Sequence, residues 1–488
     1  MSGGITIVGL GPGGSELWTQ SAFTVLTESS LVYVRTIRHP GVEDIPGEVR
    51  SFDDLYEQAD TFDQVYDTIA AEICRLGAEA AGVVYAVPGH PAVGEASVAL
   101  IRQQAGAKGI PLSIVPGLSF IEPALAALGI DALDGLQLAD ATRLATLHYP
   151  PLDPDRPALV AQLYGRRLAG DVKLTLLAAY PPDYPITLIR AAGTPLEAQV
   201  RCALAELDRQ APIDHLTTLY LPPAPATSGL PAFQETIAHL RAPDGCPWDR
   251  EQTHQSLRPY LLEETYEVLA ALDADDPAQL AEELGDLLLQ IVLHAQIASE
   301  EGAFLMGDVI RHIDQKIHRR HPHVFGDITV NGVSDVIHNW EAIKKQEKVK
   351  NGQDFETASV LDGVPEALPA LAQALALSQR AVRAGFEWPD VDSLLASLVE
   401  EAQEIARAGD QRELEAEIGD LLFVVVNLAR WLKVDPESAL RRMNARFQRR
   451  FKQMEALAAQ RQLSLEALDV ATYEALWAEA KRLTAHLE

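Results

Sequence analysis

Cysteine is scarce in this chain: only three occur among its 488 residues. Cys74, Cys202 and Cys246 lie far apart in the sequence. They provide neither the paired spacing of a zinc site nor the dense framework of a disulfide-stabilised secreted protein. The sequence therefore predicts free thiols in a reducing compartment, and we expect a cytoplasmic location.

Long apolar runs are also missing. The purest one, Leu421–Val426, is far shorter than the roughly 18 residues that a membrane-spanning helix needs. The apolar run near the N-terminus, Ile5–Leu10, has no basic residues before it and ends in glycines, which is untypical of a signal peptide. We expect no membrane partner.

Positive charge is outweighed by negative charge, with 40 Lys and Arg against 70 Asp and Glu and a formal net charge of −30. Such a balance disfavours nucleic acid as a partner, because phosphate backbones attract basic surfaces. A small anionic substrate stays compatible with this charge if divalent cations lie between the two negative partners.

What the chain does contain is two halves of different pattern. A length of 488 residues exceeds a single hydrophobic core, so two or three domains are expected. In residues 1–222, short β-rich runs alternate with helical stretches, which is typical of an α/β fold with a mainly parallel sheet, followed here by a second lobe. We expect strands at Ile5–Leu10, Leu31–Val34, Val83–Val87, Leu112–Val115, Leu174–Tyr180, Ile186–Ala192 and Leu216–Leu221.

After a proline-rich linker at residues 223–231, the pattern becomes helical. Ala, Leu, Glu, Arg and Gln recur at the 3.6-residue period of an amphipathic helix, and strand-like runs nearly vanish. This half also repeats itself, so we expect two all-α units, residues 232–355 and 356–488. The predicted fold is therefore multidomain, with a two-lobed α/β N-terminal domain and a duplicated all-α C-terminal half.

The repeat carries the same acidic residues in the same order. Each copy reads EExxE, a gap, and then ExxD: Glu263–Glu267 with Glu283–Asp286, and Glu400–Glu404 with Glu417–Asp420. Carboxylates three or four positions apart share a helix face, so two antiparallel helices would bring four of them together. Their repulsion, ~4 kcal/mol for a close pair at an effective dielectric near 20, favours bound Mg²⁺, which takes carboxylate oxygens together with substrate phosphates. A solvated acidic helix face is the alternative, but it explains the paired repetition poorly.

Basic and aromatic residues follow the acidic motifs in both copies. Each copy has basic residues on one helical stretch and, later, a tryptophan with a lysine four positions after it. Guanidinium and ammonium groups can hold phosphates, and an indole ring can stack on a base. A basic surface helix with a half-buried tryptophan is the simpler alternative. These basic and aromatic residues are Lys316, Arg319, Arg320, Trp340 and Lys344 in the first copy and Arg446, Arg449, Arg450, Trp477 and Lys481 in the second.

Six segments make the pattern of this half more specific: Gly245–Asp249, Leu262–Glu267, Glu283–Leu288, Arg319–Phe325, Gly385–Trp388 and Glu417–Phe423. Together they resemble the MazG family of all-α nucleoside triphosphate pyrophosphohydrolases. The resemblance implies a homodimer that cleaves an NTP or dNTP between the α and β phosphates, with Mg²⁺ as the cofactor and Mn²⁺ as the other candidate ion. It implies the metal ligands Glu264, Glu267, Glu283 and Asp286 in the first copy and Glu401, Glu404, Glu417 and Asp420 in the second, with Glu264, Glu267, Glu401 and Glu404 also catalytic. It also implies that substrate is contacted by Arg446, Arg450, Trp477 and Lys481 in the second copy, with Lys316, Arg320, Trp340 and Lys344 as their counterparts in the first.

The N-terminal half carries glycines where its predicted strands end. One strand runs into Gly9-Leu-Gly-Pro-Gly13, another into Pro88-Gly-His-Pro91, and a third into Pro116-Gly117. Glycines at several strand ends fit a ligand crevice in an open α/β sheet. These segments resemble the tetrapyrrole (corrin/porphyrin) methylase superfamily, and the fusion to a MazG-like half resembles the YabN-type arrangement. The resemblance implies S-adenosylmethionine as a cofactor, bound by Gly9, Gly11, Gly13, Pro88, Gly89 and His90.

Two positions depart from the methylase pattern. Gly14 stands where the first glycine motif usually has an acid, and His90 stands where the second loop usually has an aspartate. These departures disfavour methylation of a tetrapyrrole, although the fold and the binding of S-adenosylmethionine are compatible with them.

Three functions therefore stay open. The first is an NTP pyrophosphohydrolase, in which the shorter gap between acidic motifs favours the second copy as the faster site. The second is an S-adenosylmethionine-dependent methyltransferase whose helical half serves as a dimerisation or regulatory module. The third is a non-enzymatic acidic scaffold or nucleotide sensor.

Overall fold

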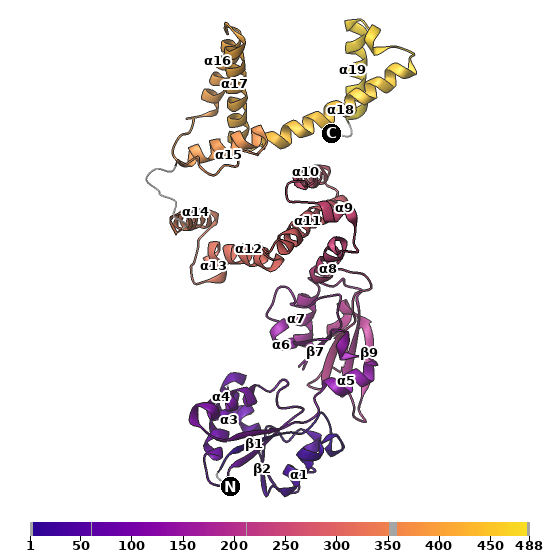
Figure 1. The fold of residues 1–488 in the computed structure, drawn as a ribbon, viewed down its shortest axis with the longest axis vertical. Coiled ribbons are helices and arrows are strands. Elements are labelled where there is room, and N and C mark those ends of the chain that lie inside the picture. Colours follow the sequence, from indigo (N-terminus) through magenta and orange to yellow (C-terminus); the bar gives the residue numbers. More distant parts are fainter. Residues whose placement is uncertain (1–2, 60, 211, 351–358, 486–488) are drawn as a thin grey trace. The chain divides into compact units, whose positions relative to one another are not determined.

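The computed structural model describes residues 3–59, 61–210, 212–350 and 359–485. The chain divides into two compact units, Met1–Arg250 and Glu251–Glu488, which Figure 1 colours along the sequence. The first is an α/β unit with two sheets, and the second is helical in its described secondary structure. The α/β and all-α classes predicted from the sequence are confirmed, whereas the finer domain boundaries stay predictions.

The first lobe of the α/β unit contains a five-stranded sheet in the order β3-β2-β4-β1-β5. Its described strand pairs are all parallel, as the alternation of strands and helices predicts. Because the strands run in one direction, their carboxyl ends meet at one edge of the sheet, where the predicted ligand loops lie. The strands are β1 (Ile5–Gly9), β2 (Leu31–Val34), β3 (Glu48–Ser51), β4 (Val83–Val87) and β5 (Leu112–Val115).

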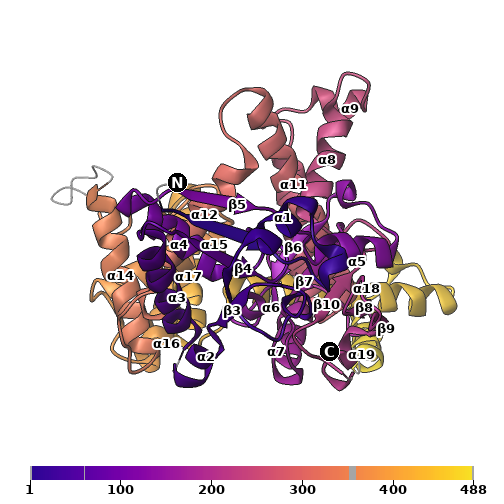
Figure 2. The same ribbon diagram turned by 90° about the horizontal axis from the view of Figure 1, so that it is seen from below.

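Helices cover both faces of this sheet. Ile5 of β1 packs into a core with α3 (Phe62–Gly77) and α4 (Ala96–Lys108), whereas Val8 packs into a second core with α1 (Gln20–Glu28). Successive residues of a strand face opposite sides, so one apolar strand can serve two cores. Figure 2 shows α3 and α4 side by side. The continuous apolar runs of β1 and β4 follow from this burial on both faces.

The second lobe contains another five-stranded sheet, in the order β6-β7-β10-β8-β9. β6 and β7 are parallel, and the other pairs are antiparallel. Its main core packs residues of β7, β8 and β10 against α6 (Ala141–Leu144) and α7 (Arg166–Leu176). The strands are β6 (Gln137–Asp140), β7 (Ala158–Ala161), β8 (Pro185–Arg190), β9 (Ala198–Ala203) and β10 (Thr217–Leu221).

The predicted strand Leu174–Tyr180 is wrong. Its first residues end helix α7, and turns follow. Val172 and Leu176 are fully buried at helical spacing, and Tyr180 continues the same spacing at 2% exposure. A short apolar run does not separate a buried helix from a strand by itself, and here the four-residue recurrence of the buried positions decides for a helix.

The Asp155 carboxylate contributes several of the contacts that join the second lobe to the start of α8 (Leu230–Arg241). Asp155 accepts hydrogen bonds from the backbone N–H of Ser228 at 2.8 Å, from the Ser228 hydroxyl at 3.1 Å and from the backbone N–H of Gly229 at 2.9 Å. Burial opposes ionisation of Asp155, but the hydrogen bonds from Gly229 and Ser228 outweigh it and lower the pKa of the carboxyl. The start of α8 is therefore fastened to the second lobe.

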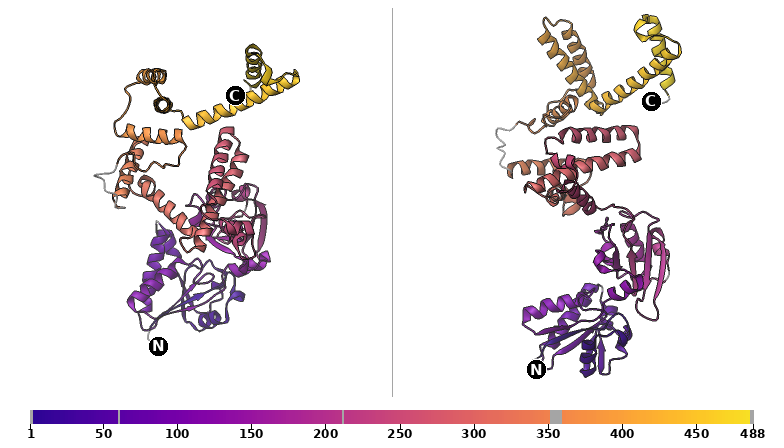
Figure 3. Two further views of the ribbon diagram at one scale, coloured as in Figure 1. Left: turned by 45° about the horizontal axis from the view of Figure 1, so that its top comes forward. Right: turned by 45° about the vertical axis from the view of Figure 1, so that its right-hand side comes forward.

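The helical unit repeats a pattern of paired helices. α10 (Arg258–Ala274) packs on α11 (Pro277–Glu300), and α16 (Val391–Ile405) packs on α17 (Gln411–Trp431). Figure 3 shows these helices from two further sides. The remaining helices of the unit are α12 (Met306–Arg320), α13 (Pro322–Phe325), α14 (Val333–Lys350), α15 (Ala370–Arg383), α18 (Pro436–Gln460) and α19 (Val470–Thr484), and α9 (Pro247–Glu251) lies at the unit boundary.

Both helix pairs turn over short, capped connections. Asp275, with φ of 53°, ends α10, and the Asp276 carboxylate then accepts from the backbone N–H of Ala278 at 3.0 Å to begin α11. In the second pair, the Asp410 carboxylate accepts from the backbone N–H of Glu413 at 2.9 Å to begin α17. Aspartate at such N-cap positions satisfies backbone donors that have no partner inside the helix. The caps fix where α11 and α17 start and therefore which of their faces meet α10 and α16.

Large apolar side chains of α11 and α17 are exposed in the single chain. Contiguous exposed apolar surface of this kind marks protein interfaces. The side chains, each at least 39% exposed, are Leu284, Leu288 and Ile291 on α11 and Ile418, Leu422 and Val425 on α17. Within the described part of the chain, none of the helices combines the length and the hydropathy that a bilayer span requires.

Candidate functional site

An acidic cluster lies between α10 and α11. Carboxylate oxygens of Glu264, Glu267 and Glu283 lie within 4.8 Å of one another. Glu264 and Glu267 share a face of α10, and Glu283 lies in the early part of α11, which packs on α10. Asp286 lies close enough for its charge to act on Glu264. The fold therefore gathers all four acidic residues predicted for the first copy.

The second copy forms the same kind of cluster between α16 and α17. Carboxylate oxygens of Glu401, Glu404 and Glu417 lie within 4.8 Å of one another. The charge of Asp420 acts on both Glu401 and Glu417, although its own side chain is exposed. Sequence repetition thus corresponds to repetition of geometry.

Crowding of negative charge shifts the ionisation of these carboxyls. Loss of solvation raises the pKa of Glu264, and the charges of Asp286 and Glu267 raise it further. Loss of solvation likewise raises the pKa of Glu417, followed by the charges of Glu404 and Asp420. A raised pKa means that the ionised form of each cluster is destabilised, first by lost solvation and then by repulsion between the carboxylates. Each cluster would therefore gain from a proton or a cation.

The donor set indicates which cation fits. Each cluster offers carboxylate oxygens alone, without the thiolate or imidazole ligands that select zinc or copper. Hard divalent ions such as Mg²⁺ and Mn²⁺ prefer oxygen donors and can share them with phosphate oxygens. The convergent oxygens and the raised pKa values together make both clusters suitable for such an ion.

A polar contact between side chains also holds each of the helices α11 and α17, which carry Glu283 and Glu417. The sequence analysis did not predict these contacts. On α11, the Nδ1 atom of His294 lies 2.8 Å from the Nδ1 atom of His254. On α17, the buried Asn427 amide accepts a hydrogen bond from the hydroxyl of the buried Ser378. Nothing in the local sequence pattern pointed to His254 or Ser378 as their partners.

In the first copy, basic and aromatic side chains gather between α12 and α14. The Arg320 guanidinium carbon lies 5.8 Å, and the Lys344 ammonium 4.4 Å, from the centre of the Trp340 ring. Lys316 is exposed on α12, one turn before Arg320. The Glu347 carboxylate, which the sequence analysis did not single out, accepts a hydrogen bond from Arg320 at 2.6 Å.

In the second copy, the corresponding group lies between α18 and α19. The Lys481 ammonium is 5.6 Å from the centre of the Trp477 ring, and the Phe447 ring centre is 5.5 Å from it. Arg446 and Arg450 lie on α18, on either side of Phe447 in sequence, and both are half-buried. The fold thus pairs a tryptophan with a lysine in both copies, on helices different from those that carry the acidic clusters.

Glycines pack tightly at the carboxyl edge of the first sheet. A Cβ atom on Gly9 would lie 2.6 Å from both the Gly117 nitrogen and the Gly89 oxygen. Gly11 has φ of +70° and forms backbone hydrogen bonds with Gly89. The Gly11 carbonyl also accepts a hydrogen bond from the Nε2 atom of His39 at 2.8 Å. Only glycine permits such close backbone approach. The loops at this edge contain the predicted residues Gly9, Gly11, Gly13, Pro88, Gly89 and His90.

A buried ion pair near the same edge was also not predicted. Arg35, directly after β2, lies with its NH1 atom 2.9 Å from an oxygen of Glu95, whose side chain is 4% exposed. Burial raises the pKa of Glu95 to about 7, against the opposing charge of Arg35. The Arg35 side chain stands where a dinucleotide-binding fold would place an acid, so this lobe departs from that pattern.

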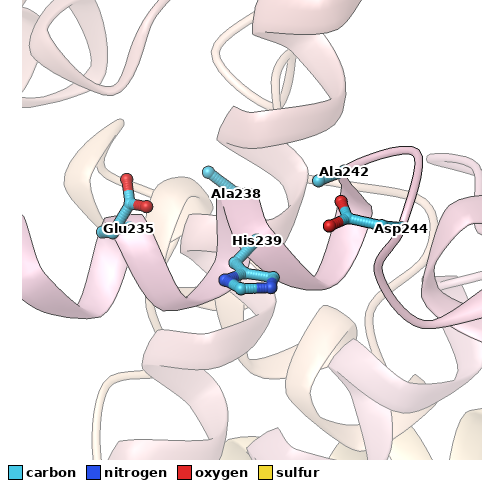
Figure 4. A pocket seen from close by; sticks show the side chains of 5 residues that line it. All are labelled: Glu235, Ala238, His239, Ala242 and Asp244. Carbon is cyan, nitrogen blue, oxygen red and sulfur yellow. The ribbon is translucent and has the colours of Figure 1, made fainter.

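A hollow on the surface of the first unit contains none of the predicted site residues. It has a volume of about 250 Å³ and lies along α8. Figure 4 shows the side chains of Glu235 and His239 projecting from α8, with Asp244 just beyond its end. The shallow hollow and the acidic clusters are thus separate features.

Comparison with known families agrees with the two-part architecture. The MazG nucleotide pyrophosphohydrolase domain matches residues 252–325 and 390–454. The tetrapyrrole (corrin/porphyrin) methylases match residues 4–208. The MazG segments contain both acidic clusters, and the methylase segment contains the glycine-rich edge.

One relative extends over nearly the whole chain, and others extend over about half of it. An uncharacterised protein, YabN of Bacillus subtilis, is 41% identical over 492 residues and covers 99% of both chains. A nucleoside triphosphate pyrophosphohydrolase/pyrophosphatase, MazG of Thermotoga maritima, is 47% identical over 252 residues, which are 51% of this chain and 95% of the relative. Among solved structures, the uroporphyrin-III-C-methyltransferase of Thermus thermophilus aligns with a TM-score of 0.37 at 24% identity, over 46% of this chain and 93% of that one.

Proposed function

This chain belongs to the family that joins a tetrapyrrole methylase domain to MazG nucleotide pyrophosphohydrolase units, and from that premise we propose that it hydrolyses nucleoside triphosphates. The substrate is an NTP or dNTP, cut between the α and β phosphates to give the monophosphate and pyrophosphate. The observation that carries the proposal is the duplicated acidic cluster in the segments that match the MazG domain. The relatives named as nucleoside triphosphate pyrophosphohydrolases support it.

Mg²⁺, with Mn²⁺ as the alternative, is the cofactor that the donor atoms favour. When bound, the ion neutralises phosphate oxygens and lowers the pKa of a water ligand. A glutamate of each cluster would accept the proton of the attacking water, and the raised pKa values of Glu264 and Glu401 favour such a role. The proposed ligands are Glu264, Glu267, Glu283 and Asp286 in the first unit and Glu401, Glu404, Glu417 and Asp420 in the second, and the proposed proton acceptors are Glu264, Glu267, Glu401 and Glu404.

The basic and aromatic residues of each unit would bind the remainder of the substrate. Guanidinium and ammonium groups hold phosphates through charge-assisted hydrogen bonds, and an indole can stack on a base. The contacts of Trp340 with Lys344 and of Trp477 with Lys481 support this assignment, because they place a ring and a cation side by side. The proposed set is Lys316, Arg320, Trp340 and Lys344, with Arg446, Arg450, Trp477 and Lys481.

A homodimer would complete the sites. The acidic clusters and the basic groups lie on different helix pairs, and the helices with the metal ligands expose apolar side chains such as Ile291 and Val425. A second copy that covers these faces would supply both burial and the missing half of each site. Sedimentation of the Ile291→Arg and Val425→Arg proteins tests this arrangement. We expect both variants to shift toward monomer, and variants that remain as dimeric as the wild type would contradict the arrangement.

One panel of assays tests the reaction itself. The purified protein is incubated with Mg²⁺ and each NTP and dNTP in turn, and pyrophosphate and orthophosphate are measured separately. Pyrophosphate with the nucleoside monophosphate is the expected product pair. Orthophosphate alone would mean that a different bond is cut, and nucleotide binding without turnover would favour a sensor. The proposal places the protein in the cytoplasm, where its substrates are formed.

A second activity is favoured by the glycine-rich edge of the first sheet. The loops that contain Gly9, Gly89 and Gly117 meet at the carboxyl edge of the parallel sheet, where open α/β sheets bind their ligands, and the methylase match supports S-adenosylmethionine. In this alternative the helical half dimerises or regulates a methyltransferase. Calorimetric titration with S-adenosylmethionine and a labelled-methyl transfer assay distinguish it from the hydrolase, because neither readout depends on Glu283 or Glu417.

A further inference from the structure

An internal carboxylate occupies one of the groups that is proposed to hold phosphate. Glu347 on α14 lies 2.6 Å from the Nε atom of Arg319 and 2.6 Å from the NH2 atom of Arg320. The side chains of Arg320 and Glu347 are only 19% and 15% exposed. The Arg320 guanidinium, which a substrate of the first unit would need, is therefore already paired with the Glu347 carboxylate.

The carboxylate belongs to the same group of side chains as the proposed substrate residues. Trp340, Lys344 and Glu347 follow one another at helical spacing and share a face of α14. Arg320 approaches the Trp340 ring to 5.8 Å and donates to Glu347 at 2.6 Å. A phosphate held by Arg320 would therefore meet the Glu347 carboxylate directly.

The opposite charges of Glu347 and the two arginines make their contact persistent. Hydrogen bonds from Arg320, with further ones from Arg319, lower the pKa of Glu347 to about 2. The group is therefore ionised throughout the physiological pH range. Carboxylates and phosphates accept paired hydrogen bonds from guanidinium in a similar way, so the two compete for the same donors.

The second unit has no carboxylate at the corresponding position. The third residue after Lys481 is Thr484, whereas the third residue after Lys344 is Glu347. The Thr484 hydroxyl donates to the Ala480 carbonyl within its own helix at 2.9 Å. The two units, which share the acidic clusters, thus differ in the residue one turn after the lysine that neighbours the tryptophan.

We propose that Glu347 acts as a built-in competitor of the triphosphate at the first helical unit. Substrate must displace this carboxylate from Arg319 and Arg320 before those arginines can bind its phosphates. The inference rests on the proposed function and deepens it, because it names a residue that limits the affinity of the first unit for its substrate. The first unit consequently requires a higher triphosphate concentration than the same unit with a neutral side chain at position 347.

Single-unit activity of the full-length chain provides the test. In a Glu404→Gln/Glu417→Gln background, turnover comes from the first unit alone, and there Glu347→Gln is expected to lower KM by roughly three- to tenfold with little change in kcat. In the reciprocal Glu267→Gln/Glu283→Gln background, Glu347→Gln leaves KM unchanged. Asp314→Asn removes a negative charge from α12 whose described partner is His318, and it leaves KM unchanged if the effect belongs to the carboxylate that pairs with the arginines.

Opposite outcomes separate the competitor from a structural role. If Glu347 only ties α14 to α12, its replacement leaves KM constant or raises it, and the proposal is overturned. A change of equal size in Asp314→Asn overturns it as well, because general repulsion would then explain the effect.

Binding of inorganic tripolyphosphate, measured by calorimetry without turnover, keeps this question apart from the reaction. Tighter binding by Glu347→Gln supports the competitor even if no nucleotide is hydrolysed. Lack of pyrophosphate release by the wild type contradicts only the proposed function. Unchanged tripolyphosphate binding contradicts the competitor even in an active enzyme.

Discussion

The Nδ1 atoms of His254 and His294 lie 2.8 Å apart, so that one ring donates and the other accepts. This hydrogen bond ties α11 to the segment that precedes α10. Ser378 and Asn427 make the comparable contact in the second unit, but neither of them titrates near neutral pH. The two units are thus braced by contacts of different pH sensitivity.

As the pH falls, the first unit is expected to lose activity earlier, at a higher pH, than the second unit does. Burial, followed by the charge of His254, lowers the pKa of His294. Since the folded pKa of His294 is below its ordinary value near 6.5, the unfolded state takes up the proton first, and stability declines as the pH falls through about 6.5. Single-unit activities compared between about pH 7.5 and pH 5.5 should diverge by roughly tenfold.

Replacing the brace provides the control for this pH effect. The His254→Ser/His294→Asn protein carries the polar pair of the second unit. Its first-unit profile should become as flat as that of the second unit. If this protein still loses first-unit activity at low pH, groups other than the two histidines cause the pH effect.

Neutralising one glutamate should separate metal binding from stability. Loss of solvation and the charges of Glu404 and Asp420 raise the pKa of Glu417, so the stabilising protonated form is present at low pH and is lost as the pH rises through the folded pKa. Glu417→Gln keeps a neutral group at pH 7 and should raise the unfolding temperature in EDTA, whereas Mg²⁺-dependent turnover of the second unit should fall by about 100-fold. Glu415→Gln, on the same helix but outside the cluster, should do neither. In a Glu267→Gln/Glu283→Gln background, where the first cluster is disabled, a Glu417→Gln protein that still gains stability from Mg²⁺ would remove this residue from the ligand set.

Lys481 should contribute to substrate affinity more than to the chemical step. Its ammonium lies beside the Trp477 ring, where it would meet phosphates of a stacked nucleotide. Lys481→Met in the second-unit-only protein should raise KM by roughly tenfold, the worth of one charge-assisted contact. Lys452→Met removes an exposed lysine from α18 and should leave KM as it is. Equal effects of both changes would indicate a response to net charge alone.

Two glycines of the first lobe should respond oppositely to alanine. A Cβ on Gly9 would lie 2.6 Å from backbone atoms of both Gly89 and Gly117, whereas a Cβ on Gly106 in α4 meets nothing within 4 Å. Gly106→Ala should stabilise the lobe by about 0.5–1 kcal/mol through helix propensity. Gly9→Ala should destabilise it by several kcal/mol or prevent folding, because backbone has to move. Denaturant unfolding of the first unit measures both, and a tolerated Gly9→Ala would mean that the edge is loosely packed.

Local periodicity explains why the acidic clusters could be predicted from the sequence. Glu264 with Glu267, and Glu401 with Glu404, lie one turn apart on single helices, and the duplicated order indicated which helices meet. The α/β and all-α halves were predicted for the same reason, since the period of apolar residues changes between them. The wrong strand Leu174–Tyr180 shows the limit of this signal, because a short apolar run lacks a clear period.

Contacts between distant segments could not be predicted from the sequence. His254 with His294, Ser378 with Asn427, and Glu347 with Arg320 join residues that no local spacing connects. Each partner is an ordinary polar residue in its own segment, and only tertiary packing gives it a role. The ion pair of Arg35 with Glu95 is of the same kind, because its effect on the pKa of Glu95 depends on burial.

The three hydrogen bonds that Asp155 accepts from Ser228 and Gly229 determine where the protein can be divided. A cut in the proline-rich stretch around residue 225 would leave the Asp155 carboxylate without its donors and would strip α8 from the lobe that anchors it. Truncation after Arg250 preserves both. Workers who wish to express the halves as separate proteins should therefore place the junction there, and proteases should find the proline-rich stretch a poor substrate despite its composition.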